Sequence, residues 1–335
     1  MGDVNEGIVL RHRPHGLLRH EDVELVELPM PEPPSGGCVI EVGWLGIDAT
    51  VRSWLSAGEG YLPAVELGEV VRCSGIGTVI ATDSPRFPIG HVVSCLSGWQ
   101  RYAALEDNLL ATPLGQPEAV DQLAMLAVYG ATGLTAYVGM IDVGEIKEGE
   151  TVVVSAAAGA TGSLAAQIAK LHGCRVVGIA GTAEKCQWLV DDLGLDGAIN
   201  HRADDVVARL KALCPNRIDV FFDNVGGPVL DACLARLNNG GRVVLCGAIS
   251  SYNDEHRPPG PANYLNLIQR RGSMRGFLSL DHWGRFPEIA GVLAGWVAEG
   301  KLQYRTEQFD GLESAVDALN AMFLGRNTGK IVIKL

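Results

Sequence analysis

Residues 151–170 read Thr-Val-Val-Val-Ser-Ala-Ala-Ala-Gly-Ala-Thr-Gly-Ser-Leu-Ala-Ala-Gln-Ile-Ala-Lys, and this stretch decides the fold. An apolar, β-branched run ends in a turn of small residues, and an amphipathic helical pattern follows directly. The turn is a variant of the dinucleotide fingerprint G-x-G-x-x-G, in which Ala157 replaces the first glycine. Gly159 would let the backbone approach a pyrophosphate, and Gly162 would let the helix pack close to its strand. The alternative is a tightly packed strand–helix turn that holds no ligand.

The end of the next predicted strand, 175–180, favours one of the two nicotinamide cofactors. NAD enzymes usually place Asp or Glu there, to hold the ribose 2′-hydroxyl. Here that position is Gly181, followed by Thr182 and, one helical turn later, by Lys185. Glycine leaves room for a 2′-phosphate and lysine supplies a positive charge, so the sequence favours NADP(H). The alternative is that Lys185 is only a solvated helix residue.

Length and composition narrow the class of protein. The 335 residues suggest two domains, each able to bury a core. The formal charge of −12, without a basic run, argues against a nucleic-acid partner. The eight cysteines form no C-x-x-C pair and the N-terminus has no apolar signal core, so a cytoplasmic location is expected. The charge-poor stretches 122–141 and 151–169 are rich in Gly, Ala and Thr, so they indicate buried elements rather than a membrane partner.

Two patterns of elements divide the chain. Residues 7 to about 125 predict an irregular β-rich domain, with strands at 7–11, 23–28, 38–47, 70–79 and 91–96. From about 130 to 300, strands and helices alternate, which is typical of a doubly wound parallel sheet. The predicted strands are near 152–156, 175–180, 197–199, 218–222, 242–246 and 273–279, and the helices near 161–172, 183–193, 203–213, 228–236 and 283–299. The tail ends in a predicted strand at 330–334.

Several segments, taken together, resemble the zinc-independent medium-chain dehydrogenases/reductases, and within them the prostaglandin reductase, leukotriene B4 12-hydroxydehydrogenase and 2-alkenal reductase group. They are Tyr61-Leu-Pro63, Gly98-Trp-Gln100 with Tyr102, Gly133-Leu-Thr-Ala-Tyr137, residues 155–162, Phe222-Asp-Asn-Val-Gly-Gly227, Cys246-Gly-Ala-Ile-Ser-Ser-Tyr-Asn253, Gly276-Phe-Leu278 and Asn327-Thr-Gly-Lys330. The resemblance implies a GroES-like catalytic domain at 1–127, a Rossmann NADP-binding domain at 128–300 and a C-terminal return to the catalytic domain at 301–335. It also implies an active site in the cleft between the domains, and a homodimer in which strand 274–278 pairs across a two-fold axis.

The same resemblance assigns cofactor contacts to individual residues. Those near the phosphates are Gly159, Ala160, Thr161, Gly162, Gly181, Thr182, Lys185 and His201. Those near the sugar and the nicotinamide are Asn224, Cys246, Gly247, Ala248, Ile249, Tyr252, Phe277, Leu278 and Asn327. Alternatives remain open for some of them: Asn224 and Asn327 as turn residues, and Phe277 with Leu278 as ordinary core strand.

The chain departs from the family pattern at four places. Zinc-containing relatives carry Gly-His-Glu where this chain has Gly68-Glu69, so no metal is expected. Asn200-His201-Arg202 stands in place of Asn-Tyr-Lys beside the 2′-phosphate. Gly130-Ala-Thr-Gly133 lacks a methionine of the family pattern. Asp48-Ala-Thr-Val-Arg52 replaces Asp-Pro-Tyr-Met-Arg, which removes an aromatic side chain near the substrate.

The activity that the resemblance implies is NADPH-dependent reduction of the C=C bond of a small conjugated carbonyl substrate. The cofactor supplies hydride, and the protein must orient the substrate and stabilise negative charge on its carbonyl oxygen. A phenol suits this task because it donates a hydrogen bond without being ionised at neutral pH. Tyr252 is the first candidate and Tyr61 the second, with a merely buried tyrosine as the alternative for each. The loops near Tyr61 and over 252–264 are expected to shape the pocket.

Three other functions stay open on the sequence. A quinone reductase on the same fold would also use NADPH and a conjugated acceptor. A second alternative is that the reaction runs backward, as in an alcohol dehydrogenase. A non-catalytic NADP-binding interaction protein would keep the cofactor site without turnover.

Overall fold

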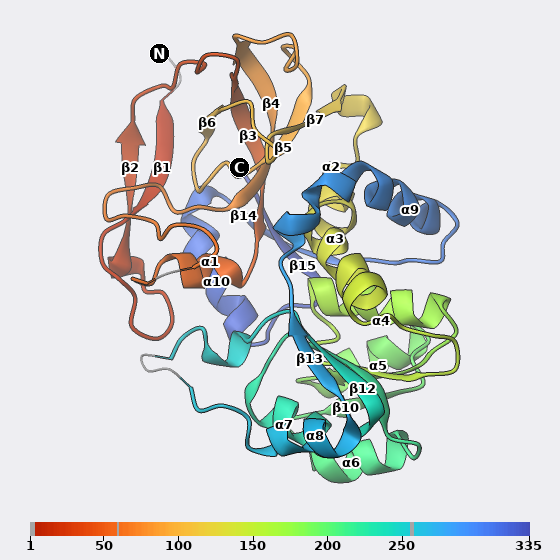
Figure 1. The fold of residues 1–335 in the computed structure, drawn as a ribbon. Coiled ribbons are helices and arrows are strands. Elements are labelled where there is room, and N and C mark those ends of the chain that lie inside the picture. Colours follow the sequence, from red (N-terminus) through yellow and green to blue (C-terminus); the bar gives the residue numbers. More distant parts are fainter. Residues whose placement is uncertain (1–3, 59, 255–257) are drawn as a thin grey trace. The chain divides into compact units, whose positions relative to one another are not determined.

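The computed structural model describes residues 4–58, 60–254 and 258–335 (Figure 1). The chain forms two compact units. The first unit runs to Leu126 and takes in Thr306–Leu335, and the second is Ala127–Arg305. Each unit buries a hydrophobic core of its own.

The first unit is built on antiparallel strands. Its seven-stranded sheet consists of β14 (Thr306–Asp310), β15 (Lys330–Lys334), β3 (Cys38–Ile47), β4 (Ser74–Thr82), β5 (Val92–Cys95) and β7 (Thr112–Gly115) in this order, with β6 (Tyr102–Leu105) paired to β3. A separate pair is formed by β1 (Asn5–Leu10) and β2 (Val23–Leu28). The tail strand β15 lies antiparallel to β3, with Ile331 opposite Ile47. This register brings the residues just before β15 beside those just after β3.

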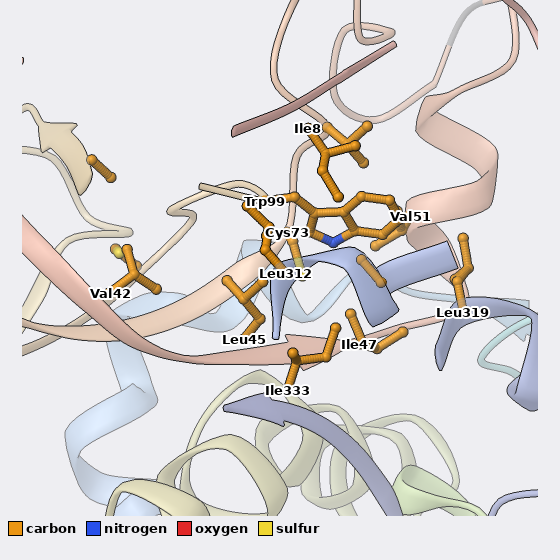
Figure 2. Packing of buried hydrophobic residues seen from close by; sticks show 14 of the residues in the cluster. Ile8, Val42, Leu45, Ile47, Val51, Cys73, Trp99, Leu312, Leu319 and Ile333 are labelled. Atoms are coloured by element: carbon orange, nitrogen blue, oxygen red, sulfur yellow. The ribbon is translucent and has the colours of Figure 1, made fainter. Parts of the chain in front are cut away.

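The core of the first unit gathers around Trp99. Figure 2 shows Leu45 and Ile47 of β3 and Ile333 of β15 grouped at this indole, and all three are at most 1% exposed. The short helix α1 (Thr50–Trp54) contributes Val51, and α10 (Ala315–Phe323) contributes Leu319. Burying one such aliphatic side chain stabilises the fold by about 1.5–3 kcal/mol, so the tail segment is held by its own core residues.

The second unit is a doubly wound parallel sheet. Its strand order is β10 (Gly197–Asn200), β9 (Arg175–Ala180), β8 (Thr151–Val154), β11 (Ile218–Asp223), β12 (Leu237–Leu245) and β13 (Ser273–Gly276), and every pairing is parallel. Its helices include α3 (Ala131–Tyr137), α4 (Ala160–Leu171), α5 (Ala183–Asp191), α6 (Val206–Leu213), α7 (Gly227–Ala235), α8 (Leu265–Arg270) and α9 (Phe286–Ala298). The strand order reverses between β8 and β11, where open α/β sheets bind ligands at the carboxyl ends of their strands. The predicted fold class is therefore confirmed.

Some elements were not predicted, and others begin elsewhere than expected. The predicted strand 70–79 begins at Ser74, because Val70 forms only an isolated bridge with Val9. The strands and α-helices without a counterpart among the predicted strands and helices are α1, β6, β7, α2 (Gln122–Ala124), α3, α8, β14 and α10. All but α3 and α10 are six residues or shorter, and such pieces show too few residues for a period to be recognised.

The helical segment Gln122–Val143 is apolar and almost free of charged residues. It includes α2 and α3 and, in the described part of the chain, is the one helix long and apolar enough to cross a membrane. Most of its apolar window is buried inside the protein, as in the core helix of a globular fold. The other charge-poor stretch, 151–169, forms β8 and most of α4.

Candidate functional site

The fingerprint turn joins β8 to α4. Ala156 has a φ of +47°, and Gly159 is the N-terminal cap residue of α4. A Cβ on Gly162 would lie 2.3 Å from the carbonyl oxygen of Ala156, so glycine is required for the helix to approach the turn this closely. Among the described residues, no side chain caps this helix start. The first N–H groups of α4, around Ala160 and Thr161, are therefore suited to an anion such as a pyrophosphate.

A network of hydrogen bonds joins this turn to the end of β11. Ser155 Oγ donates to Asp223 Oδ1 at 2.8 Å, and the backbone N–H of Asn224 donates to Ser155 Oγ at 2.8 Å. The Asp223 carboxylate also accepts from the backbone of Val225 and Gly226. Burial raises the pKa of Asp223, while these hydrogen bonds oppose the shift. The network fixes the carboxyl ends of two neighbouring strands relative to each other.

Asn224 takes part in the same network through its side chain. Its Nδ2 donates to the backbone carbonyl of Ser155 at 2.7 Å. The alternative left open was that Asp223 and Asn224 together shape the turn before Gly226, and the hydrogen bonds of both residues fit that role. The contact of Asn224 with the cofactor sugar remains a prediction.

Tyr252 lies shortly after β12 in the second unit. The backbone N–H groups of Cys246 and Gly247 donate to the carbonyl of Asp223, and that of Ile249 donates to the carbonyl of Asn224. The segment 246–249 is thereby held at the end of β11. The Tyr252 hydroxyl accepts a hydrogen bond of 3.1 Å from the backbone N–H of Ala248. This bond uses a lone pair of the phenol oxygen and not its proton, so the geometry is compatible with donation to a carbonyl oxygen.

The end of β9 gathers positive charge around Gly181. A Cβ on Gly181 would lie 3.3 Å from His201 Nε2 and 3.5 Å from Arg202 Nε. Thr182 caps α5 by accepting from the backbone N–H of Lys185 at 3.2 Å. Partial desolvation of the His201 ring, with the nearby charges of Arg202 and Lys185, lowers the pKa of His201 below its usual 6.5. A neutral histidine beside two cations, with no Cβ on Gly181, fits a site for a phosphate group.

Phe277, Leu278 and Asn327 are the remaining residues that were predicted to contact the cofactor. Phe277 and Leu278 follow β13, where Phe277 packs partly buried against the core of the second unit and Leu278 is 37% exposed. Asn327 belongs to the first unit, is 8% exposed and donates from Nδ2 to the carbonyl of Gly329 at 3.0 Å. That bond is the contact expected of a turn residue. Cofactor roles for these three residues remain predictions.

Tyr61 lies in the first unit, on the loop that follows α1. Its hydroxyl forms a hydrogen bond with Thr50 Oγ1, and its ring contacts Trp54 edge-on with the centroids 6.2 Å apart. The guanidinium of Arg72 lies 5.4 Å from the Trp54 ring centre. Loss of water at the hydroxyl end raises the pKa of Tyr61, and Asp48 raises it further, although 43% of the residue is exposed. The phenol is therefore protonated at neutral pH and available as a donor.

Sequence reasoning did not assign roles to Ser155, Asp223, Thr50 or Arg72. Ser155 and Asp223 follow or end neighbouring parallel strands, and that placement was a usable signal for a shared hydrogen bond. Thr50 was noted only as the position that lacks an aromatic ring. The predicted loop 252–264 includes residues 255–257, which lie outside the described residues, and Arg257 is one of them.

No metal cluster is found in residues 4–58, 60–254 and 258–335, where no group of three or more His, Cys, Asp or Glu side chains is arranged to hold an ion. The eight cysteines are all free thiols. Enclosure by protein atoms raises the pKa of Cys246 to about 12, so this thiol beside the candidate site is protonated at neutral pH.

Two family models match the chain. Residues 6–112 match the N-terminal domain of oxidoreductase, and residues 160–294 match a model described as zinc-binding dehydrogenase. The chain is 38% identical over 336 residues to the NADPH-dependent curcumin reductase of Escherichia coli, covering 99% of this chain and 97% of that protein. It is 35% identical over 335 residues to the NADP(+)-dependent 2-alkenal reductase of Nicotiana tabacum, covering 98% and 97%.

A solved structure is similar over the same length. The crystal structure of CurA from Vibrio vulnificus in complex with NADPH matches with a TM-score of 0.92 and 40% identity, covering 98% of each chain. Both units are thus represented in a single relative.

Proposed function

The chain belongs to the medium-chain dehydrogenase/reductase family, and we propose that it is an NADPH-dependent reductase of the C=C bond of α,β-unsaturated aldehydes and ketones. The observation that carries the proposal is similarity over nearly the whole chain to two reductases of conjugated substrates, curcumin and 2-alkenals. NADP(H) is the cofactor, and the NADPH complex of a relative with 40% identity supports this choice.

The residues present fit NADPH at both of its phosphate positions. No side chain of the described residues caps the start of α4, which therefore suits the pyrophosphate. Gly181 has no Cβ and lies beside His201 and Arg202, and this space suits the 2′-phosphate. When bound, NADPH supplies the hydride that the substrate takes up at its β-carbon. The protein then has to orient the acceptor and stabilise the charge that forms on it.

Tyr252 is the residue to which we assign charge stabilisation. Its hydroxyl accepts from the Ala248 backbone, and in this assignment it donates to the carbonyl oxygen of the substrate, which becomes an enolate oxygen as hydride arrives. Tyr61, with its hydroxyl set by Thr50, is assigned to the substrate as the second donor. Water supplies the proton that the α-carbon requires. Neither tyrosine needs to be ionised at any step.

We also propose that the protein acts in the cytoplasm as a homodimer. Among the described strands, β13 lies at the end of the six-stranded sheet, and its outer edge suits pairing with a second copy. Free thiols at all eight cysteines are typical of a reducing compartment. Light scattering of the purified protein tests the dimer, and a monomeric mass at working concentrations contradicts it.

The test of the function is NADPH oxidation against a panel of acceptors. The panel holds 2-nonenal, curcumin, a 15-keto prostaglandin, a simple enone, a naphthoquinone and an acceptor-free blank, each repeated with NADH. We expect enone-dependent oxidation with a strong preference for NADPH. Turnover of the quinone alone would assign the protein to the quinone reductases, and tight NADPH binding without any turnover would favour an interaction protein.

A matched pair of tyrosine variants sharpens the same test. Loss of one preorganised donor costs about 10²–10³-fold in kcat, and we expect that loss for Tyr252→Phe with enone substrates. Tyr304→Phe is the control, because it removes the hydroxyl of a tyrosine that packs partly buried against the core of the second unit and has no assigned role in the reaction. Equal activity of the two variants would remove Tyr252 from the mechanism.

A further inference from the structure

An ion pair in the first unit, between a buried lysine and a partly exposed aspartate, has no part in the chemistry proposed above. Lys330 is 2% exposed, and its ammonium group pairs with Asp48 Oδ1. Asp48 Oδ2 accepts a second hydrogen bond of 3.1 Å from Ser74 Oγ. Taking an ammonium ion out of water is costly, and apolar residues in the place of a buried ion pair often stabilise a protein more. The pair is better explained by what it holds in place than by the stability it adds.

Three features of the fold fix the place where the pair forms. Lys330 opens β15, whose next residue, Ile331, lies opposite Ile47 of β3. Asp48 directly follows Ile47, so the register of the two strands sets the two charges side by side. The lysine stem passes over Gly46, where a Cβ would lie 3.3 Å from Lys330 Cε. A side chain at position 46 would have to displace this stem.

The pair connects two segments to which we assigned functional roles. On the tail side, Asn327 lies three residues before Lys330, in a turn closed by its own bond to Gly329. On the other side, Thr50 lies two residues after Asp48 and is hydrogen-bonded to the Tyr61 hydroxyl. Asp48 also acts on Tyr61 through its charge, in the direction already described.

We propose that Lys330 and Asp48 are positioning residues, which hold the Asn327 turn and the Thr50–Tyr61 hydroxyl pair in one fixed arrangement for the reaction. The inference rests on the proposed function, which assigns Asn327 to the cofactor and Tyr61 to the substrate. Lys330 and Asp48 act through these two residues. A displacement of reacting groups by about 1 Å costs on the order of 100-fold in rate, so a pair of this kind matters to catalysis without contacting the substrate.

The first experiment compares two lysine variants. Lys330→Met keeps the apolar stem and removes the charge, and we expect kcat to fall on the order of 10- to 100-fold, with a smaller change in the Kd of NADPH. Lys170→Met is the matched control, because it breaks a Lys–Asp pair of the second unit, with Lys170 Nζ 2.9 Å from Asp196 Oδ2. The control is expected to leave kcat within about twofold of wild type. Equal effects of the two variants on kcat overturn the proposal.

A double-mutant cycle separates positioning from a general loss of structure. If Lys330 acts through Tyr61, then Tyr61→Phe lowers kcat less in the Lys330→Met background than in the wild-type background. Lys330→Arg, which keeps the charge, is expected to restore much of the activity. Strictly additive effects of Lys330→Met and Tyr61→Phe contradict the coupling.

Hydrogen exchange gives a readout that needs no turnover. Amides of residues 48–58 and 324–329 are expected to exchange faster in Lys330→Met than in wild type or Lys170→Met. A wild-type protein inactive toward every conjugated acceptor overturns the proposed function, whereas unchanged exchange in these two segments overturns the coupling. The two failures are therefore distinguishable.

A double variant without a charge at either position replaces Lys330→Met if that single variant does not fold. Asp48→Asn combined with Lys330→Met removes both charges together and leaves no unpaired carboxylate, so we expect it to fold. The proposal requires that this double variant also lose kcat and exchange faster in the two segments. A folded double variant with wild-type kcat and wild-type exchange overturns it.

Discussion

Lys185 and Lys330 are two cations that the protein surrounds in opposite ways. Lys185 is half-buried at the start of α5, near the neutral ring of His201 and the positive charge of Arg202. Lys330 is buried, and its charge meets the carboxylate of Asp48. Like charges gathered near a surface attract an anion, whereas a buried ion pair already contains both charges. The first arrangement suits the recognition of a ligand, and the second suits the internal geometry of the protein.

The largest effect is expected when the positive charges around Gly181 are removed. Lys185→Ala combined with Arg202→Ala takes away two charge-assisted contacts worth about 1.5–3 kcal/mol each, so the preference for NADPH over NADH should fall by about 10²- to 10⁴-fold. The measurement is the Kd of each cofactor by fluorescence titration. Lys211→Ala, an exposed lysine on α6, is the control. An unchanged Kd ratio in the double variant would place the 2′-phosphate elsewhere.

The two lysines also differ in how far the sequence could predict them. Gly181 and Lys185 follow a strand of recognisable pattern at a fixed distance, so their place at its carboxyl end could be counted along the chain. Lys330 and Asp48 are 282 residues apart, and their contact depends on the register of β15 against β3. Side-chain periodicity indicates that a strand exists but not which residue it will face. The motif Asn327-Thr-Gly-Lys330 was recognised, but the partner of its lysine was not.

The second effect concerns stability. Lys330→Met leaves Asp48 without its buried partner, and the cost should be about 3 kcal/mol in the free energy of unfolding, near the low end for such pairs because Asp48 is about one-third exposed. Lys185→Ala should change this free energy by less than about 0.5 kcal/mol, as is usual for surface positions. Urea unfolding followed by tryptophan fluorescence compares the two. If both variants lost the same free energy of unfolding, Lys330 and Lys185 would not differ in their contribution to stability.

The third effect is a pH dependence of NADPH binding that arises from His201. The lowered pKa of His201 keeps the ring neutral in the free protein at neutral pH, and a bound 2′-phosphate should favour its protonated form. Binding then takes up a proton, so NADPH should bind more tightly as the pH falls from 8 toward 6, by up to about tenfold for one unit of pKa shift. His201→Gln should lose this part of the pH dependence. The measurement is the Kd ratio of variant to wild type, and a ratio constant over this range would exclude protonation of His201.

The tyrosines mark another limit of prediction from sequence. The hydrogen bond between Tyr252 and the Ala248 backbone joins residues four apart, shortly after β12, and the sequence predicted a role for Tyr252 there but not this bond. The bond between Thr50 and Tyr61 spans eleven residues of helix and loop. The sequence showed that an aromatic ring was missing at position 50. That the hydroxyl of Thr50 engages Tyr61 depends on the loop conformation, for which no local pattern exists.

The smallest effect is expected from salt. Exposed charges lose much of their interaction when the screening length falls from about 10 Å at 0.1 M to about 3 Å at 1 M, so the Kd of NADPH should rise severalfold over that range. In the Lys185→Ala, Arg202→Ala variant this rise should nearly vanish, because the charges that salt screens are gone. The loss of stability in Lys330→Met should be nearly independent of salt, since a buried pair is screened much less. If salt instead reduced that loss as strongly as it weakens NADPH binding, Lys330 would be exposed to ions in solution, and its assignment as an internal contact would fail.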